Sequence, residues 1–305
     1  MTSSVAIVEV GPRDGFQSMR SVLPTATKTE IIRSLYQAGV RRIETTSFVS
    51  ERAVPQLADA TEIVAFSAQF PELDAQVLVP TARHAQRALA AGADHLCAVL
   101  SVSESHNRGN VRRSPMESVE DYRQMVETMP AGTAMRLNVA TAFDCPNAGR
   151  VPERAVLELL DHLVAVTSDA EIALCDTTGK ADPAQVTALF EAVKKRFPQV
   201  RNWAFHGHDT YGLGTANVYA AWRAGIDVFD ASVAGLGGCP FAPGATGNVA
   251  TEDVVWMFES MGVRTGIDIE ALVQASHVIC ELPDSQTGGR VRDALSARAK
   301  RAVAA

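Results

Sequence analysis

Two histidines separated by a single glycine are the residues of this chain best placed to do chemistry. His206 and His208 follow the apolar run Trp203 to Phe205 and precede a polar stretch, so we expect them at the end of a buried strand. Side chains two residues apart on a strand point to the same side. The spacing therefore suits two imidazoles that bind one metal ion. Two structural histidines at a strand end would give the same short pattern.

Three further residues favour the metal interpretation over the structural one. Asp14, Cys239 and Asn248 each occur where another element could bring them to the same place. One carboxylate, one amide oxygen and two imidazoles make a mixed oxygen and nitrogen donor set that leaves room for a substrate. Such a set favours Mg2+ or Mn2+ as the cofactor and permits Zn2+.

The elements that must position these groups follow a regular alternation along the chain. Strands that alternate with helices pair in parallel through crossovers, and eight such units predict an α/β fold, a (β/α)8 TIM barrel with extra C-terminal helices. The predicted strands are Ala6–Val10, Arg42–Thr46, Gln76–Pro80, His95–Ser101, Met135–Ala140, Glu171–Asp176, Trp203–His208 and Val228–Val233. The predicted helices are Lys28–Ala38, Val54–Phe66, Arg83–Ala91, Met116–Met129, Pro152–Thr167, Pro183–Arg196, Thr215–Ala224, Thr251–Met261 and Ile269–Cys280.

No Pro-rich or Ser-rich linker and no shift in composition divides the chain. We therefore expect a single catalytic domain over residues 1–305, with the barrel at about 5–262 and a helical extension at about 263–305. The basic stretch from Gly288 to Ala305 is predicted to be an exposed terminal helix. Glycines at 39, 92 and 225 are expected to cap three of the helices.

Chemistry in such barrels sits at the mouth where the strands end. Titratable groups gather at that position along this chain. They are Arg13 and Asp14 after the first strand, Glu44 in the second, Asp176 at the end of the sixth, the two histidines at the end of the seventh, and Cys239 after the eighth. This agreement between fold and chemistry is stronger than any one motif.

The composition excludes several classes of function. The net charge is −7 and the pI is near 5.5, which argues against a nucleic-acid partner. The longest apolar runs fall short of the roughly 20 residues that a membrane helix needs, and we expect neither a membrane partner nor a secretory signal. The five cysteines are odd in number and widely spaced. They predict a reducing, cytoplasmic setting.

Three stretches of the chain together resemble a known family. They are Val8–Gly15, with the sequence VEVGPRDG, Ile43–Ser50, with IETTSFVS, and the block from His206 to Asn248, with HGHDTYG and VAGLGGCPFA. The chain thus resembles the 3-hydroxy-3-methylglutaryl-CoA lyases from about Val5 to Cys280. That family consists of metal-dependent TIM-barrel lyases, which cleave their substrate to acetyl-CoA and acetoacetate.

The resemblance implies roles for individual residues and a homodimer. It implies that the metal ligands are Asp14, His206, His208 and Asn248, and that the catalytic residues are Arg13, Glu44, Asp176, Cys239 and His206. Two departures put the acyl substrate in doubt. Gly207 stands where the family often has cysteine, and Asp144 to Asn147 replace the family's Gly-Cys-Pro after the fifth strand.

The chemistry of such a lyase explains why these residue types are needed. Cleavage of the C2–C3 bond requires loss of the hydroxyl proton, which coordination to a divalent cation favours. Arg13 would stabilise the departing enolate, and Glu44 would orient Arg13 or form a plain ion pair with it. Asp176 would accept a proton or cap a helix. Cys239 lies in a glycine-rich segment predicted to be a mobile lid, where it would return a proton to carbon or be inert.

The segment from Ser105 to Arg113 is locally basic and is predicted to be a loop after the fourth strand. Asn107 and Arg108 are the candidate contacts to the coenzyme A phosphates, although an ordinary solvated loop fits equally well.

Three alternatives to hydroxymethylglutaryl-CoA cleavage remain open at this point. A lyase for citramalyl-CoA or for a longer-chain hydroxyglutaryl-CoA would use the same residues. A condensing synthase of the isopropylmalate or citramalate type would form the bond instead of breaking it. A non-catalytic protein that binds a CoA thioester or a metal on the barrel scaffold is the third, because fold alone does not fix function.

Overall fold

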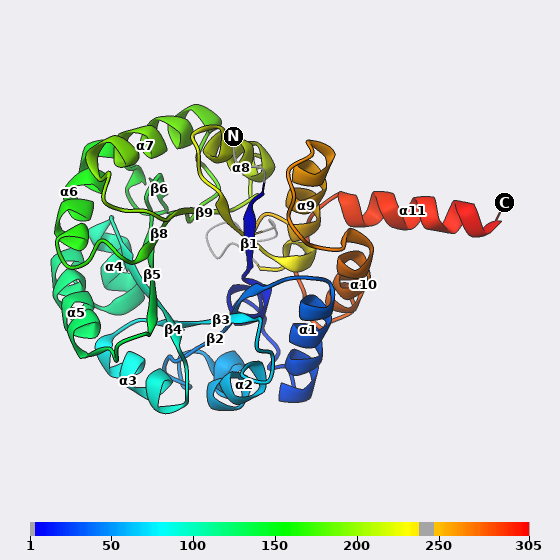
Figure 1. Ribbon diagram of the computed structural model, residues 1–305, viewed down its shortest axis with the longest axis horizontal. Coiled ribbons are helices and arrows are strands. Elements are labelled where there is room, and N and C mark those ends of the chain that lie inside the picture. The colour runs from blue at the N-terminus through cyan, green and yellow to red at the C-terminus, as the bar shows by residue number, and fades with distance from the viewer. Residues whose placement is uncertain (1–3, 238–246, 305) are drawn as a thin grey trace.

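The computed structural model describes residues 4–237 and 247–304. Within these residues, eight parallel strands close into a barrel in the order β1-β10-β9-β8-β5-β4-β3-β2 (Figure 1). The strands are β1 Ala6–Glu9, β2 Arg42–Ser47, β3 Asp74–Val79, β4 His95–Ser101, β5 Ala134–Ala140, β8 Glu171–Asp176, β9 Trp203–Gly207 and β10 Val228–Ala231. The predicted TIM barrel is confirmed, and each predicted strand end lies within two residues of the observed one.

Helices surround the strands as the alternation predicts (Figure 1). They are α1 Thr25–Gln37, α2 Ala60–Ser67, α3 Ala82–Ala90, α5 Pro115–Thr128, α6 Glu153–Val164, α7 Pro183–Arg196, α8 Gly214–Arg223, α9 Thr251–Ser260 and α10 Ile269–Cys280. The single helix predicted for 54–66 is wrong, because a short turn at Pro55–Leu57 precedes α2. The buried Lys28 binds the carbonyl of Gln56 at 2.5 Å, and an uninterrupted helix would need that carbonyl for its own ladder.

Three elements differ from or add to the prediction. The loop expected after β4 is a helix, α4 Glu104–Val111, whose first turn is capped by the hydroxyl of Ser103. A small hairpin, β6 Asp144–Cys145 with β7 Gly149–Arg150, follows β5. The predicted terminal helix is present as α11 Val291–Ala304, which extends away from the barrel (Figure 1). Over the described ranges, no helix has both the length and the apolar character that crossing a membrane requires.

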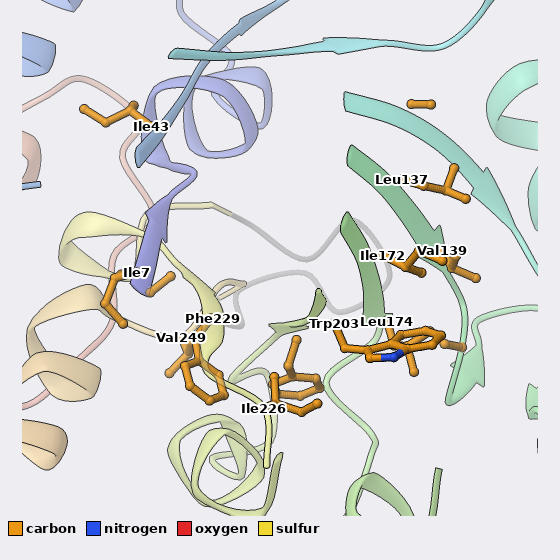
Figure 2. Packing of buried hydrophobic residues seen from close by; sticks show 14 of the residues in the cluster. Ile7, Ile43, Leu137, Val139, Ile172, Leu174, Trp203, Ile226, Phe229 and Val249 are labelled. Atoms are coloured by element: carbon orange, nitrogen blue, oxygen red, sulfur yellow. The ribbon is translucent and has the colours of Figure 1, made fainter. Parts of the chain in front are cut away.

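The two faces of the strands carry different side chains. Alternation along each strand sends Ile7, Ile43, Ile172 and Phe229 outward, where they pack in the core between strands and helices (Figure 2). The inward positions of many strands are charged or polar instead, among them Arg42, Glu44, Asp74, Gln76, Arg136, Asn138, Glu171, His206 and Asp230. TIM-barrel interiors are usually filled by aliphatic layers. A polar interior on this scale therefore requires that buried charges find partners.

The three predicted glycine caps are confirmed by their backbone. Gly39 and Gly92 both have φ of +95°, and Gly225 has φ of +84°. Two of these positions differ in their surroundings. A Cβ at Gly39 would lie 2.5 Å from the carbonyl oxygen of Gly266, whereas a Cβ at Gly92 would meet no atom within 4 Å.

This difference makes a matched pair of substitutions. Gly92→Ala is expected to lower the free energy of unfolding by about 1–2 kcal/mol, the cost of a left-handed backbone alone. Gly39→Ala should cost clearly more, because the backbone at Gly266 must also move. Urea denaturation of both variants at one pH checks the difference, and equal losses would show that the contact with Gly266 has no energetic weight.

Candidate active site

Asp14, His206 and His208 converge at the carboxyl ends of the strands. One potential ligand atom from each lies within 4.8 Å of those of the other two, although Asp14 is 192 residues from His206 along the chain. The imidazole of His206 on β9 and that of His208, directly after β9, have centroids 5.2 Å apart. The pattern of alternate residues along the chain thus places both rings beside the carboxylate that follows β1.

A tight turn after β1 presents Asp14. Residues Gly11–Gly15 form a single π-helical turn in which the amides of Arg13, Asp14 and Gly15 all point to the carbonyl of Val10, at 3.1, 2.7 and 3.4 Å. Such turns are frequent at functional sites. Here the turn puts Arg13 and Asp14 together at the mouth of the barrel.

Asn248 joins the same group from the segment that follows the undescribed residues. Its neighbour Val249 donates to the carbonyl of Gly207 at 3.1 Å, which pairs this segment with the end of β9. The side-chain Nδ2 donates to Asp14 Oδ2 at 2.8 Å. Its Oδ1 is buried and has no partner among the described residues, and neither does Nδ1 of His208. A buried oxygen left without a donor beside a carboxylate and two imidazoles fits the donor set of a divalent cation.

Hydrogen bonding prepares the two imidazoles differently. His206 Nδ1 lies 3.0 Å from Asp230 Oδ2. Because an ionised carboxylate only accepts, Nδ1 is the donor, and Nε2 of the neutral ring keeps its lone pair. Burial alone would lower the pKa of His206, but the hydrogen bond and the charge of Asp230 raise it above its usual value. Burial, with the nearby His206, lowers the pKa of His208 to about 4, so its ring is neutral and available as a ligand at neutral pH.

Arg13 is buried between two carboxylates. Its Nε donates to Glu44 Oε2 at 2.6 Å, and a terminal nitrogen donates to Asp14. Burial opposes ionisation of Asp14, but the charge of Arg13 outweighs it and holds the pKa of that carboxyl well below its usual range. Burial keeps the pKa of Glu44 raised despite the same guanidinium. The predicted pairing of Arg13 with Glu44 is confirmed, and Asp14 shares the guanidinium.

Asp176 ends β8 next to the histidine strand, where it pairs in register with Gly207. Its Oδ2 accepts from the amide of Ala181 at 3.1 Å, while its buried Oδ1 has no partner in the described chain. It does not cap a helix, since the N-cap of α7 is Asp182. Burial raises its pKa to about 6. A carboxyl group with this pKa can both accept and release a proton near neutral pH.

The candidate coenzyme contacts occupy different environments. Asn107 is fully buried: its Oδ1 accepts from the amide of Ser101 at 2.8 Å, and its Nδ2 donates to Arg113 O and Ser118 Oγ. These bonds hold α4 against β4, so the prediction that Asn107 contacts coenzyme A has no support in its geometry. Arg108 is exposed beside Glu104. Cys239 lies outside the described residues.

Sequence reasoning missed two buried glutamates that hold the neighbouring backbone. Glu9 accepts from the amides of Gly11 and Val233, both at 2.8 Å, and from the hydroxyl of Thr251 at 2.6 Å. Glu252 accepts from the amide of Ala234 at 3.0 Å. The second turn, Val233–Gly235, contains Ala234 at φ of +58° and is therefore strained. A lone acid inside an apolar strand, as at Glu9, was the available signal.

The departure at Gly207 has a packing explanation. A Cβ at this position would lie 2.7 Å from the ring of Phe205, which is fully buried against Phe143 and Phe190. The aromatic ring thus takes the volume that a side chain at 207 would need. Position 207 points to the opposite side of the chain from His206 and His208, so the glycine does not alter the side that carries the two imidazoles.

Comparison with known proteins agrees with this geometry. Residues 4–279 match the family described as HMGL-like. The chain belongs to this family. Cytoplasmic 3-hydroxy-3-methylglutaryl-CoA lyase of Rattus norvegicus is 40% identical over 291 residues, which cover 95% of this chain and 84% of the relative. Mitochondrial hydroxymethylglutaryl-CoA lyase of Homo sapiens is 38% identical over 95% of this chain and 89% of its own.

Solved structures extend the similarity to the fold. Hydroxymethylglutaryl-CoA lyase from Pseudomonas aeruginosa aligns with a TM-score of 0.92 at 37% identity, over 98% of this chain and 99% of its own. An HMG-CoA lyase from Acinetobacter baumannii, in complex with coenzyme A and 3-methylmalate, aligns with a TM-score of 0.89 at 38% identity, over 96% and 95%. The resemblance predicted from the sequence motifs is confirmed.

Removal of one imidazole tests the metal interpretation. His208→Ala is expected to raise the Kd for Mn2+ by more than about 100-fold, beyond the 10–100-fold effect of groups that only support a ligand. Isothermal titration of metal-stripped protein measures it. His162→Ala, at an exposed position on α6, is the matched control, and an unchanged Kd for His208→Ala would contradict the assignment.

The buried glutamates predict a pH dependence of stability. Burial raises the pKa of Glu9 from 4.5 to about 7. The folded state therefore binds more protons than the unfolded state between these values, and the contribution of Glu9 to stability falls as pH rises through this window. The shift corresponds to about 3 kcal/mol.

Glu9→Gln removes this titration while keeping the shape of the side chain. The free energy of unfolding of Glu9→Gln minus that of the parent protein should increase between pH 4.5 and pH 7, by up to about 3 kcal/mol. Urea denaturation at several pH values in EDTA measures the gain. The exposed Glu62→Gln serves as control, and parallel pH curves for Glu9→Gln and the parent would refute the prediction.

Proposed function

We propose that this protein is a carbon–carbon lyase that cleaves 3-hydroxy-3-methylglutaryl-CoA to acetyl-CoA and acetoacetate. The observation that carries the proposal is the group Asp14, His206, His208 and Asn248, which gathers beside Arg13 at one mouth of the barrel. Membership of the HMGL-like family and the lyases among its relatives support the same reaction.

The reaction begins with loss of the proton from the C3 hydroxyl. Asp176 is the proposed acceptor, because its Oδ1 is unpartnered among the described residues and its pKa of about 6 keeps a carboxylate available at neutral pH. The electron pair then forms a ketone at C3 while the C2–C3 bond breaks. A divalent cation held by the four ligands would favour deprotonation of the hydroxyl and orient the acyl chain.

The departing acetyl-CoA carries the electron pair as an enolate. Arg13 is the proposed stabiliser of its oxygen, since a guanidinium stays charged at any working pH and is fixed here by Glu44. Return of a proton to C2 completes the products, and we assign that role to Cys239. His206 serves as a ligand whose Nδ1 is held by Asp230.

We propose Mg2+ or Mn2+ as the metal, with Zn2+ as the alternative. Coenzyme A is the proposed carrier of the acyl group, in keeping with the coenzyme found in the Acinetobacter baumannii relative. Arg108 is exposed on α4 and remains a candidate for its phosphates. We also propose a homodimer, as the family resemblance implies. The four described cysteines are unpaired, which supports the cytoplasm as the compartment.

An acyl-CoA panel tests this function. Metal-stripped protein receives Mg2+ or Mn2+ and a reductant, and products from hydroxymethylglutaryl-CoA, citramalyl-CoA and a longer-chain hydroxyglutaryl-CoA are identified by mass spectrometry. We expect acetyl-CoA and acetoacetate from the first substrate, no product with EDTA, and a loss of at least about 100-fold in kcat for Arg13→Ala, the scale of losing one oxyanion donor.

The exposed Arg33→Ala is the matched control, because its guanidinium pairs with Glu30 on the surface of α1. Turnover of another acyl-CoA alone would replace the substrate but keep the reaction type. Release of free CoA from acetyl-CoA and a 2-oxo acid would indicate a condensing synthase instead.

A further inference from the structure

Two clusters of ion pairs, buried except at Asp14, Arg42 and Asp74, line the inside of the barrel. The upper cluster consists of Glu44, Arg13 and Asp14, and it ends on a proposed metal ligand. The lower cluster consists of Asp74, Arg42, Glu171, Arg136 and Asp230, linked in that order by contacts of 2.9, 2.9, 2.9 and 2.6 Å. It ends on the second ligand, because Asp230 also binds His206.

Asp230 is held from two sides and has little freedom to turn. It is 3% exposed and lies inward on β10, in register with His206. Its Oδ1 accepts from Arg136 at 2.6 Å, and its Oδ2 accepts from His206 Nδ1 at 3.0 Å. Each carboxylate oxygen thus has its own donor, which fixes the plane of the carboxylate and the direction of the imidazole.

Arg136 is fixed in turn by neighbours on β5 and β8. Its side chain is almost fully buried, at 1% exposed, and Nε and both terminal nitrogens of its guanidinium donate hydrogen bonds. Nε donates to Asn138 at 2.9 Å, and the other two reach Glu171 and Asp230. Its planar fork therefore defines where the carboxylate of Asp230 sits.

The charges of the two clusters are unequal in the same direction. With carboxylates ionised and imidazoles neutral, the upper cluster has two negative groups and one positive group. The lower cluster has three negative groups and two positive groups, with His95, which contacts Asp74 at 2.6 Å, counted as neutral like the other imidazoles. Each lacks one positive charge. A divalent cation held by Asp14 and His206 would lie next to both clusters and would supply the two missing positive charges.

We propose that Asp230, fixed by Arg136, is a positioning residue that sets the tautomer and direction of His206 for a divalent cation. This inference rests on the metal site of the proposed function but not on the identity of the substrate. Carboxylates behind a metal-binding imidazole raise its basicity and fix its orientation. The fixed donor at Nδ1 leaves Nε2 as the ligand atom.

A purely structural role for the same contacts makes a different prediction. A buried ion pair that only stabilises the barrel affects the free energy of unfolding and leaves metal affinity alone. Glu171 offers the matched control. It binds Arg136 from the opposite side and is likewise buried, but it does not touch His206.

The test compares Asp230→Asn with Glu171→Gln in metal-stripped protein. An asparagine amide placed toward Nδ1 turns an acceptor into a donor, so the proton of His206 shifts to Nε2. We expect the Kd for Mn2+ to rise about 10–100-fold in Asp230→Asn. Glu171→Gln should lose stability in urea but keep its Kd for Mn2+ within about twofold of the parent value, as expected for a residue that does not contact the ligands.

A second readout does not involve a metal at all. Long-range proton–nitrogen NMR correlations, recorded at an alkaline pH where the imidazoles are neutral, report the tautomer of each histidine in the metal-free protein. His206 should carry its proton on Nδ1 in the parent protein and in Glu171→Gln, and on Nε2 in Asp230→Asn. Arg136→Lys, which keeps the charge but loses the fork, should raise the Kd for Mn2+ less than Asp230→Asn and replaces it if that variant does not fold.

Each adverse outcome has a definite meaning. Equal weakening of Mn2+ binding by Asp230→Asn and Glu171→Gln would overturn the positioning role and leave a general effect on the barrel. An unchanged tautomer or an unchanged Kd in Asp230→Asn would also overturn it. Failure to cleave any acyl-CoA, with these Mn2+ results as expected, would overturn only the proposed function.

Discussion

Pairing of buried charge inside the barrel is the constraint on which the rest of this structure depends. An unpaired charge in a protein interior is so costly that the group neutralises or the fold rearranges. The strand register therefore matters here beyond its effect on packing. It puts Arg136 beside Glu171 on the neighbouring strand, and it puts Asp230 beside His206. A slip of one residue would turn these groups toward the apolar helices.

Buried carboxylates also hold backbone amides at the mouth of the barrel. Glu9 accepts from the amide at the start of the turn that carries Arg13 and from the amide of Val233 across the barrel. Glu252 accepts from the strained Ala234 in that second turn. The turn that carries Arg13 and Asp14 is thus fixed by hydrogen bonds from its backbone to the barrel. Rigid support of this kind keeps the arrangement of reactive groups close to a productive geometry.

Much of this organisation could be predicted from the sequence, because it depends on local patterns. The eight strands follow from β-branched runs, and the shared face of His206 and His208 follows from strand alternation. The helix α4 could not be predicted in this way. Asn107 and Gly109 weaken its helical pattern, and the hydrogen bonds that hold it run from Asn107 to Ser101 and Ser118, which lie outside the helix.

The partners of the proposed metal ligands could not be predicted for a related reason. Asp230 and Arg136 each look like an isolated charge within an apolar strand, and 94 residues separate them. Which charge meets which depends on strand order and register around the whole barrel, and no short stretch of sequence contains that information. The ligands themselves were predicted because motif and position at a strand end agree.

The polar lining also implies a conflict between robustness and activity. Replacement of buried ion pairs by well-packed aliphatic residues is often neutral or stabilising in proteins. A version of this barrel relined with valine and isoleucine could therefore withstand heat better than the natural chain. It would also lose the net negative charge that the proposed metal site needs to attract a cation, so selection for stability alone would replace these buried ion pairs first.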